Sequence, residues 1–466
     1  MVTKASIRPE LLQNEMLGAT LQDLTRLDIH LEAKDYRRPP PLLTGIYELL
    51  TGNPFAPEGG AQINFHAPDS APSSAPRIPV VWLRIDTRYG DLASGLGRRI
   101  ELATRLESLS PPVLRSLSEQ RALLVLDWSH EGRPTFWTSN IANIVNGFSI
   151  SPQNVVILTQ NLAPHDPPEP GTPDINIINA HAFIAEFWRL FFGEKLRKDE
   201  FDAPFGFAAS APPERSHHYV CLNYEASAPR AALAALLRER PQRGFLSFRK
   251  NQFRRNMPGS TAFESDLDTI SIPENRDLHR QLVERFIAAR GNHTVDLVSD
   301  TPEHARPFLP LEAFRKSMLN IITEKEMALP DQQRFTEKTL KAIIAGLPFV
   351  VFGNQGTIRI LRDAGFDVLS DFIDHSYDEA PSPAERFDGA FRVVDAFLKR
   401  RPGFTPDEHA RLQAAAAHNR KIFERPFFQQ WVLSPINEIV SRHPEAVPHT
   451  SPARAHSAEP ATTGAL

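Results

Sequence analysis

The sequence predicts an α/β protein with two Rossmann-like domains that face each other across a cleft. Three observations lead to this fold class: apolar runs of strand length, amphipathic segments between them, and proline-rich breaks. Several of the apolar runs are continuous, which is typical of parallel strands covered by helices on both faces. The predicted strands form two groups that are separated near Pro212. Two open sheets explain this division better than one closed barrel, which stays the alternative.

The predicted strands are short and rich in β-branched residues. In the first half of the chain they are 80–85, 122–126, 155–158 and 175–178. In the second half they are 218–222, 294–298, 318–322, 349–352 and 366–369. Periodicity alone does not separate such runs from buried helix segments, so their length and composition decide in favour of strands.

Amphipathic segments at 229–238, 276–290 and 337–345 are the predicted helices between them. The proline-rich breaks lie at 66–76, 163–173 and 211–213. They divide the chain into an N-terminal domain at 1–210 and a C-terminal domain at 211–442. The tail at 443–466 is rich in Pro, Ala, Ser and Thr, a composition that predicts disorder.

Composition limits the function classes. The 466 residues are 41% hydrophobic and 23% charged, and the net charge of −4 gives no pull toward nucleic acid. The single cysteine, Cys221, excludes an internal disulfide and predicts a buried structural thiol. The chain shows neither a signal-peptide core nor an apolar stretch of membrane-spanning length. We therefore expect a cytoplasmic protein, with peripheral attachment to a membrane left open.

The segment 319–379 carries the densest chemical pattern. A strand turns polar at its carboxyl end, and a helix follows with Thr336 as its N-cap and Gly346 as its left-handed stop. The strand 349–352 and a helix at 357–364 come next. In open α/β sheets, ligands bind at the carboxyl ends of the strands.

Glu337 and Lys338 therefore start a helix beside a predicted ligand crevice. Backbone amides and a lysine at a helix start attract phosphate oxygens, and a carboxylate there accepts hydrogen bonds from the hydroxyls of a ribose. The plainer interpretation is that Glu337 complements the helix dipole while Lys338 is solvated.

The run Phe335-Thr336-Glu337-Lys338-Thr339, followed by Gly346-Leu347-Pro348-Phe349-Val350, resembles the donor-site segment of GT-B glycosyltransferases, which have two Rossmann-like domains. The α-1,3-fucosyltransferases carry a similar Glu-Lys helix followed by Gly, Pro and a strand. With Gly365-Phe366 and residues 374–379, the pattern also resembles uncharacterised bacterial and phage glycosyltransferase-like proteins. The resemblance implies that Glu337 meets the nucleotide ribose and Lys338 the diphosphate.

Asn223 and Arg230 follow the predicted strand 218–222. In the similar proteins a strand, an Asn and an Arg open the donor domain. The resemblance therefore implies that Arg230 binds a phosphate of the donor. A surface arginine at a helix start is the alternative. Arg249 and Lys250 are candidates for further positive charge in the same cleft.

Asp127, His130 and Glu131 follow the strand 122–126 in the N-terminal half. An inverting transferase needs a general base, commonly a carboxylate or a histidine, to take a proton from the acceptor hydroxyl. All three residues qualify by type and position, and Asp86 after the strand 80–85 is comparable. The alternative is an ordinary polar loop.

No metal site is predicted. Asp266-Leu267-Asp268 has the Asp-x-Asp form of metal-dependent transferases, but a polar segment precedes it instead of a hydrophobic strand. The chain also lacks the glycine-rich fingerprints of dehydrogenases and P-loop enzymes and the nucleophile elbow of α/β hydrolases.

We therefore expect a metal-independent glycosyltransferase that moves a sugar from a nucleotide-diphosphate donor to a glycan, lipid or protein acceptor. It would need no cofactor beyond the nucleotide-sugar co-substrate. A non-catalytic nucleotide- or polysaccharide-binding α/β protein is the main alternative, and a sugar-nucleotide epimerase is a weaker one.

Overall fold

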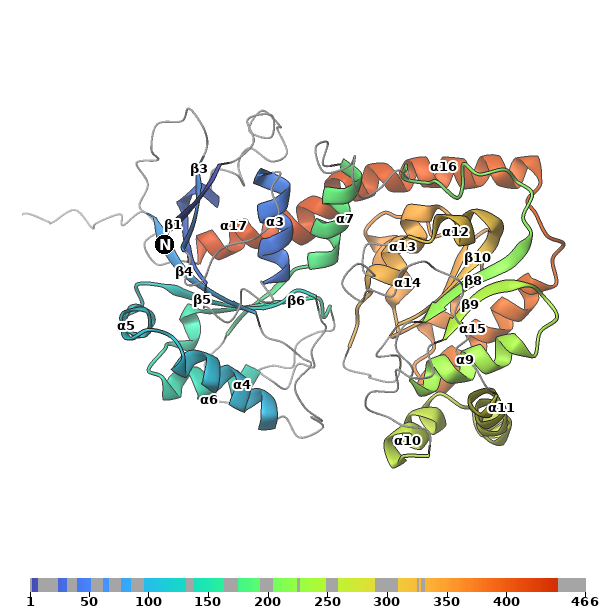
Figure 1. The fold of residues 1–466 in the computed structure, drawn as a ribbon, viewed down its shortest axis with the longest axis horizontal. Helices are drawn as coiled ribbons and strands as arrows, with labels where there is room; N and C mark the ends of the chain where they lie inside the picture. Colours follow the sequence, from blue (N-terminus) through green and yellow to red (C-terminus); the bar gives the residue numbers. More distant parts are fainter. Residues whose placement is uncertain are drawn as a thin grey trace, which may run out of the picture.

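The computed structural model gives two α/β halves that lie side by side (Figure 1). It describes residues 2–6, 24–31, 40–51, 62–66, 77–84, 96–130, 138–162, 175–192, 204–223, 227–248, 259–289, 309–324, 327 and 332–442. Within these residues, no helix is both long and apolar enough to cross a bilayer.

The first half contains a seven-stranded sheet in the order β1-β3-β2-β4-β5-β6-β7. Neighbouring strands are parallel except for β2 and β3, which are antiparallel. The strands are β1 (Val2–Ser6), β2 (Leu27–His30), β3 (Gln62–His66), β4 (Ile78–Arg84), β5 (Leu123–Trp128), β6 (Val155–Thr159) and β7 (Asn176–Asn179).

Helices cover both faces of this sheet, because alternate strand residues point to opposite sides. Trp82 and Val125 belong to the core shared with α3 (Pro41–Thr51) and α7 (Ala182–Phe192). Leu83 and Leu126 face the other way, into the core of the remaining helices. These helices are α4 (Leu96–Glu107), α5 (Pro111–Ser118) and α6 (Thr138–Gly147), and the short 3₁₀ turn η3 (Pro152–Asn154) precedes β6.

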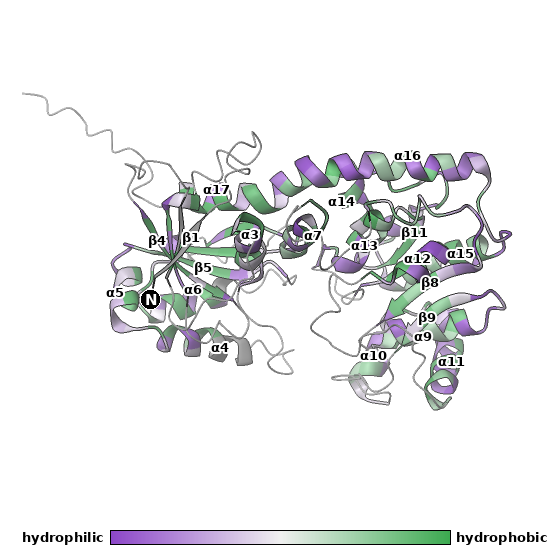
Figure 2. Ribbon diagram, turned by 45° about the horizontal axis from the view of Figure 1, so that its top comes forward, coloured by the Kyte–Doolittle hydropathy of each residue, from purple (hydrophilic) through white to green (hydrophobic). Residues whose placement is uncertain are grey.

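The second half contains a four-stranded sheet in the order β11-β10-β8-β9, parallel throughout. Its strands are β8 (His217–Asn223), β9 (Gly244–Phe248), β10 (Ser317–Thr323) and β11 (Phe349–Phe352). The helices are α9 (Ala228–Arg238), α10 (Thr261–Thr269), α11 (Arg276–Ala288), α12 (Leu311–Lys316), α13 (Glu337–Ala345), α14 (Thr357–Asp363), α15 (Pro383–Leu398) and α16 (Pro406–Ile422), with 3₁₀ turns η5 (Pro273–Asn275) and η7 (Ser376–Glu379). Figure 2 shows hydrophobic strands inside this half and hydrophilic residues along α16.

After α16 the chain crosses back to the first half (Figure 1). It passes through two π-helical turns, η8 (Phe423–Phe427) and η9 (Gln429–Leu433), and ends in α17 (Ser434–Ser441), which packs against β7. Pro426 lies inside η8 and has no amide hydrogen to donate, a local cause of the altered helical spacing. Trp188 of α7 stacks on Phe428 at 4.5 Å and donates to the Glu424 carbonyl at 2.8 Å. Aromatic packing thus joins the crossing segment to the first half.

The coarse prediction of an α/β chain with two mostly parallel sheets is confirmed. The helix predicted at 337–345 has these same bounds, with Gly346 left-handed at φ 75°. The strand predicted at 366–369 is wrong. There the Asn419 side chain donates to the Asp367 carbonyl and accepts from the Asp367 amide, and Leu369 has φ 58°. A side chain of α16 therefore satisfies the backbone that a neighbouring strand would have paired.

The other predicted strands correspond to β4–β8, β10 and β11, apart from 294–298, which lies outside the described residues. The tail at 443–466 lies outside them as well. The sequence did not predict β1, β2, β3 or β9.

Candidate functional site

Two predicted donor-site residues meet at the carboxyl edge of the four-stranded sheet. Asn223 ends β8, and its side-chain oxygen accepts a hydrogen bond from the Thr323 hydroxyl at the end of β10. Arg230 of α9 donates to the Thr323 carbonyl at 3.3 Å. Asn223 is 1% exposed and Arg230 is 3% exposed, so the interpretation of Arg230 as a surface arginine is wrong. Asn223 thus joins the ends of β8 and β10, and Arg230 ties α9 to the end of β10.

Glu324 fixes the start of α13, and the sequence analysis did not single it out. Its buried carboxylate accepts from the Thr336 amide at 3.0 Å, the Thr336 hydroxyl at 2.6 Å and the Thr339 hydroxyl at 2.7 Å. The Thr336 hydroxyl in turn accepts from the Lys338 amide at 3.3 Å, the predicted N-cap bond. The sequence signal that could have identified Glu324 is an acidic residue directly after a buried strand. The carboxylate of such a residue must find hydrogen-bond donors at the sheet edge.

Glu337 and Lys338 lie on the first turn of α13 and pair with each other, Nζ to Oε1 at 3.0 Å. Their side chains are 18% and 22% exposed. Lys338 is therefore paired with Glu337 and only partly solvated. Both residues are partly buried, yet enough of each side chain stays exposed to meet a ligand.

Lys341 adds a second lysine one turn further along α13. Burial lowers its pKa to about 8; the charge of Lys338 contributes to this shift, and two carboxylates oppose it. One is Glu337 on α13 itself, and the other is Glu186 on α7 of the first half. The sequence signal for Lys341 is its position four residues after Glu337, because this spacing places both residues on one face of the helix.

The first half abuts α13 through the strand ends of its own sheet. The Leu162 amide donates to the Gln333 carbonyl at 2.8 Å, and the Gln333 amide donates to the Asn161 side chain at 2.9 Å. Arg334, which is buried, donates to the Gln160 side chain at 3.2 Å. The segment after β6 is therefore hydrogen-bonded to the segment that leads into α13.

His181 lies at the centre of this junction and is 1% exposed. Its ring stacks on Phe335 at 4.5 Å, Nε2 donates to the Phe335 carbonyl at 3.1 Å, and Nδ1 accepts from Gln160 at 3.4 Å. These bonds satisfy the neutral ring. Burial lowers the pKa of His181 to about 3, with a smaller contribution to this shift from the charge of Arg334.

The predicted base segment lies beside the same junction, because the Ser129 carbonyl accepts from the Ala182 amide at 2.9 Å. Asp127 itself is fully buried. Its carboxylate accepts from Trp82 at 3.1 Å, the Ser129 amide at 2.9 Å and the Ser129 hydroxyl at 2.6 Å. Burial raises the pKa of Asp127 despite these bonds. In this arrangement Asp127 holds the turn after β5 and presents no oxygen to solvent.

His130 is 4% exposed, and its Nε2 accepts from Arg84 at 3.3 Å. That nitrogen is thus occupied in this state of the protein. Glu131 lies outside the described residues, as do Asp86, Arg249 and Lys250. Of the three base candidates, the structure brings Asp127 and His130 to the carboxyl edge of the first sheet, next to its contact with α13.

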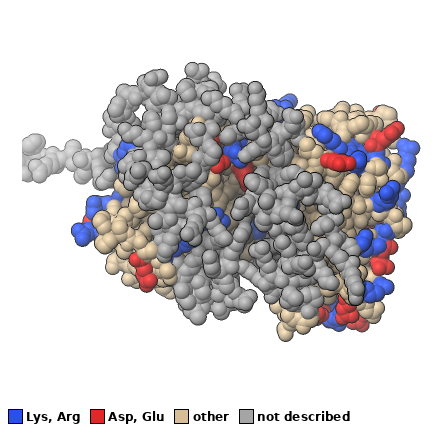
Figure 3. Space-filling model, viewed as in Figure 1, with Lys and Arg blue, Asp and Glu red and all other residues tan. Residues whose placement is uncertain are grey.

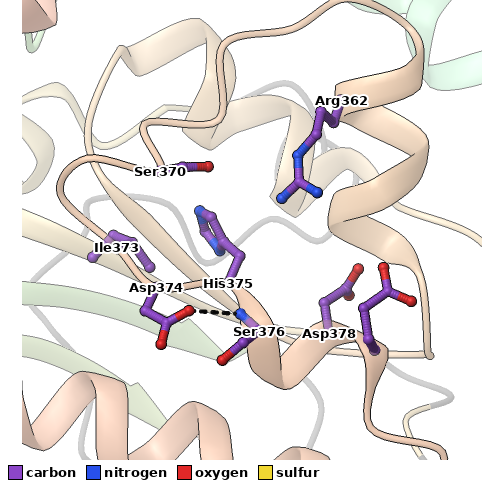
Figure 4. Close-up of a pocket in the computed structure, with 8 residues that line it drawn as sticks. Arg362, Ser370, Ile373, Asp374, His375, Ser376 and Asp378 are labelled. Atoms are coloured by element: carbon purple, nitrogen blue, oxygen red, sulfur yellow. Dashed lines mark hydrogen bonds between the residues drawn. The ribbon is translucent and has the colours of Figure 1, made fainter.

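A pocket of about 190 Å³ lies beside α14 in the second half (Figure 4). Arg362, His375 and Asp378 are among the residues that line it. Asp378 already caps α14, accepting from the Ile358 and Arg359 amides at 3.0 and 3.1 Å, and burial raises its pKa to about 6. A carboxylate thus occupies this helix start, where a phosphate would be repelled.

Among the described residues no group of three His, Cys, Asp or Glu side chains is placed to hold a metal ion. Asp266 and Asp268 lie on helix α10 instead of after a strand, and Asp268 pairs with Arg280 at 3.1 Å and Arg276 at 3.5 Å. Cys221 is buried and burial raises its pKa to about 12, which confirms the prediction of a structural thiol.

Acidic and basic side chains lie on the surface near the junction of the two halves. Figure 3 shows acidic and basic side chains close together at the middle of one face, near α3 and α7. In this part of the fold Arg189 of α7 pairs with Glu48 of α3 at 3.2 Å.

Comparison of the chain with protein-family models, with curated proteins and with solved structures finds no match.

Proposed function

We propose that the protein is a GT-B-like glycosyltransferase that takes a sugar from a nucleotide-diphosphate donor. The observation that carries the proposal is the partly exposed Glu337–Lys338 pair on the first turn of α13, beside the carboxyl end of β10. Ligands of open parallel sheets bind at this edge. The N-terminus of a helix adds a positive potential that favours phosphate oxygens.

In this proposal Glu337 accepts hydrogen bonds from the ribose hydroxyls and Lys338 binds the diphosphate. Negative charge develops on the diphosphate as the sugar leaves, so a fixed lysine and a helix start lower the barrier. Glu324 positions both side chains, because its carboxylate holds Thr336 and Thr339 in the first turn. The diphosphate then needs no metal ion as its partner.

The acceptor, a glycan, lipid or protein, is proposed to bind over the first half, beside the junction around His181. The general base comes from His130 or Glu131, since the carboxylate of Asp127 already accepts three hydrogen bonds. For His130 to act, Arg84 must release its Nε2. Asp127 is assigned to positioning, because it fixes the turn that carries the base.

A second candidate is a non-catalytic protein that binds a nucleotide or a polysaccharide at the same edge. The specific observation in its favour is the burial of both described base candidates, Asp127 at 0% and His130 at 4% exposed. The two candidates share the donor site and differ only in turnover.

A panel of nucleotides and nucleotide sugars tests the proposal. UDP, GDP, CMP and their sugars are each added to the protein, and its thermal unfolding midpoint is measured. The proposal predicts a selective upward shift with one nucleoside diphosphate and its sugar. If every ligand leaves the midpoint unchanged, the donor site is refuted. If a nucleotide sugar binds and is never turned over with any acceptor, the binding protein is the better assignment.

A further inference from the structure

The pocket beside α14 is lined by charged side chains of its own, separate from the donor-site pair. Its eight lining residues come from α14, η7 and the segment between these two elements (Figure 4). Neither Glu337 nor Lys338 is among them. The volume of about 190 Å³ holds about six water molecules, which is enough for one small organic molecule and too little for a nucleotide sugar.

Asp378 brings a buried carboxylate to this pocket, and one of its oxygens is still available. Oδ2 accepts from the Ile358 and Arg359 amides of α14 at 3.0 and 3.1 Å. Within the described part of the chain no group donates to Oδ1, although the residue is only 3% exposed. Figure 4 shows the side chain pointing from η7 into the pocket. A buried carboxylate oxygen needs a donor, and a ligand in the pocket can supply one.

Arg362 provides the opposite charge from the last turn of α14. Its guanidinium points into the pocket from the side that faces Asp378 (Figure 4). Among the described residues it forms no ion pair with a carboxylate. Burial lowers the pKa of His375 to about 4, and the charge of Arg362 contributes to this shift, in agreement with its position beside that ring.

The two other carboxylates of the lining already have partners. Glu379 pairs with Arg359 at 3.1 Å, and Asp374 accepts from the Ser376 amide at 2.9 Å. The pocket therefore presents an available carboxylate oxygen and a guanidinium that face each other without forming a pair.

These two groups select among the classes of small ligand. An anion such as phosphate is attracted by Arg362 and repelled by the carboxylates, and a simple cation is repelled by Arg362. A neutral sugar leaves both charges uncompensated. A zwitterion that carries a carboxylate and an ammonium group satisfies Arg362 and Asp378 together, through charge-assisted hydrogen bonds at both ends.

We propose that this pocket binds a free α-amino acid, with its carboxylate on Arg362 and its ammonium group on Asp378. The planar guanidinium donates two parallel hydrogen bonds to the carboxylate, and the ammonium group donates to Oδ1 of Asp378. The inference does not rest on the proposed function, because the donor-site pair lies outside this pocket.

Isothermal titration calorimetry of the full chain tests the proposal. Each common amino acid is titrated at pH 7, and glucose, galactose and inorganic phosphate represent the other ligand classes. For an amino acid that binds, the methyl ester keeps only the positive backbone charge and the N-acetyl derivative only the negative one. The expected result is saturable binding of at least one amino acid, weakened roughly tenfold or more by either blocking group. Failure of every amino acid to bind would overturn the proposal, and so would a derivative that binds as tightly as its parent.

A variant on the surface locates the ligand. Arg362→Met removes the guanidinium at an exposed position and should weaken amino-acid binding roughly tenfold or more. Arg285→Met is the matched control, because Arg285 also lies in the last turn of a helix, α11, where it pairs with Glu239 at 3.7 Å outside the pocket. This control should bind as the wild type does. Unchanged affinity of Arg362→Met would contradict the proposal.

The pH dependence of binding requires no variant. Burial raises the pKa of Asp378 to about 6, the two α14 amides oppose this shift, Glu379 adds to it, and Arg386 of α15 opposes it. Asp378 is therefore mostly ionised at pH 7 and mostly protonated at pH 5. Affinity for the amino acid should fall about tenfold from pH 7 to pH 5, because the protonated carboxyl no longer attracts the ammonium group.

The other groups at the pocket keep their charge states over this range. His375 stays neutral, because burial holds its pKa at about 4. Asp374 stays ionised, because its hydrogen bonds from Ser376 lower its pKa. Arg362 and the pair of Arg359 with Glu379 are the remaining charges nearby. Equal affinity at pH 7 and pH 5 would show that Asp378 does not hold the ammonium group and would overturn the proposal.

Discussion

Replacement of His181 by Phe tests the junction between the two halves. In the wild type the neutral ring stacks on Phe335 at 4.5 Å and donates to the Phe335 carbonyl at 3.1 Å. Phe keeps the stacking and loses the donor, which leaves a buried carbonyl without its partner. At pH 7.5 the variant should therefore be less stable by about 1–3 kcal/mol.

The pH dependence follows from the pKa of His181, which is lowered from the ordinary 6.5 to about 3. Below pH 6.5 the unfolded chain binds a proton that the folded state refuses, so stability is full above pH 6.5 and is lost as the pH falls toward 3. Each pH unit in this window corresponds to about 1.4 kcal/mol. From pH 7.5 to pH 5 the wild type should lose about 2 kcal/mol through this residue alone.

Urea unfolding of both proteins at pH 7.5, 6 and 5 gives the difference in their free energies of unfolding. His279 and His375, whose pKa values are also lowered, titrate in both proteins and cancel in that difference. The advantage of the wild type should shrink by about 2 kcal/mol between pH 7.5 and pH 5. A constant difference over this range would show that His181 is not buried in neutral form, and the account of the junction would fail.

Three further predictions concern the donor site. Glu337→Ala and Lys338→Ala should each weaken nucleoside diphosphate binding by roughly 10- to 150-fold in calorimetry, while Lys316→Ala should bind as the wild type does. Wild-type affinity in both site variants would remove the site assignment. Excess EDTA should leave turnover within a few-fold of its starting value, because a lysine and a helix start hold the diphosphate. Activity that is lost in EDTA and restored by Mn²⁺ would refute metal independence. Glu324→Gln should lower the free energy of unfolding by about 1.5–3 kcal/mol in urea titrations, since three donors lose a charged acceptor. Equal stability of the variant and the wild type would argue against the anchoring role of Glu324.

Local signals were sufficient for α13 because its limits are set by its own residues. Thr336 caps the helix with its hydroxyl and Gly346 ends it in the left-handed region. The segment 366–369 looks like a strand for the same local reasons and is not one. Its hydrogen bonds come from Asn419, which lies far along the chain on α16, so no window around the segment contains the information.

The sequence leads to the position of the proposed site, and the contacts around it come from the structure. Sequence reasoning led to Glu337 and Lys338 because a polar helix start follows a strand. It could not foresee that Trp82 of β4 donates a hydrogen bond to the Asp127 carboxylate on the neighbouring strand β5. It could also not foresee that His181 joins Phe335 across the junction, since that contact depends on how the two sheets are placed.

The most direct test of the central claim is nucleotide release from the nucleotide sugar that the binding panel selects. Release is followed in the presence of glycan, lipid and protein acceptors for the wild type, Lys338→Ala and Lys316→Ala. The account predicts turnover by the wild type, loss of roughly tenfold or more in kcat/KM for Lys338→Ala, and unchanged turnover for Lys316→Ala. Turnover by Lys338→Ala at the wild-type rate would contradict it, and so would a wild-type protein that binds the nucleotide sugar without ever releasing the nucleotide.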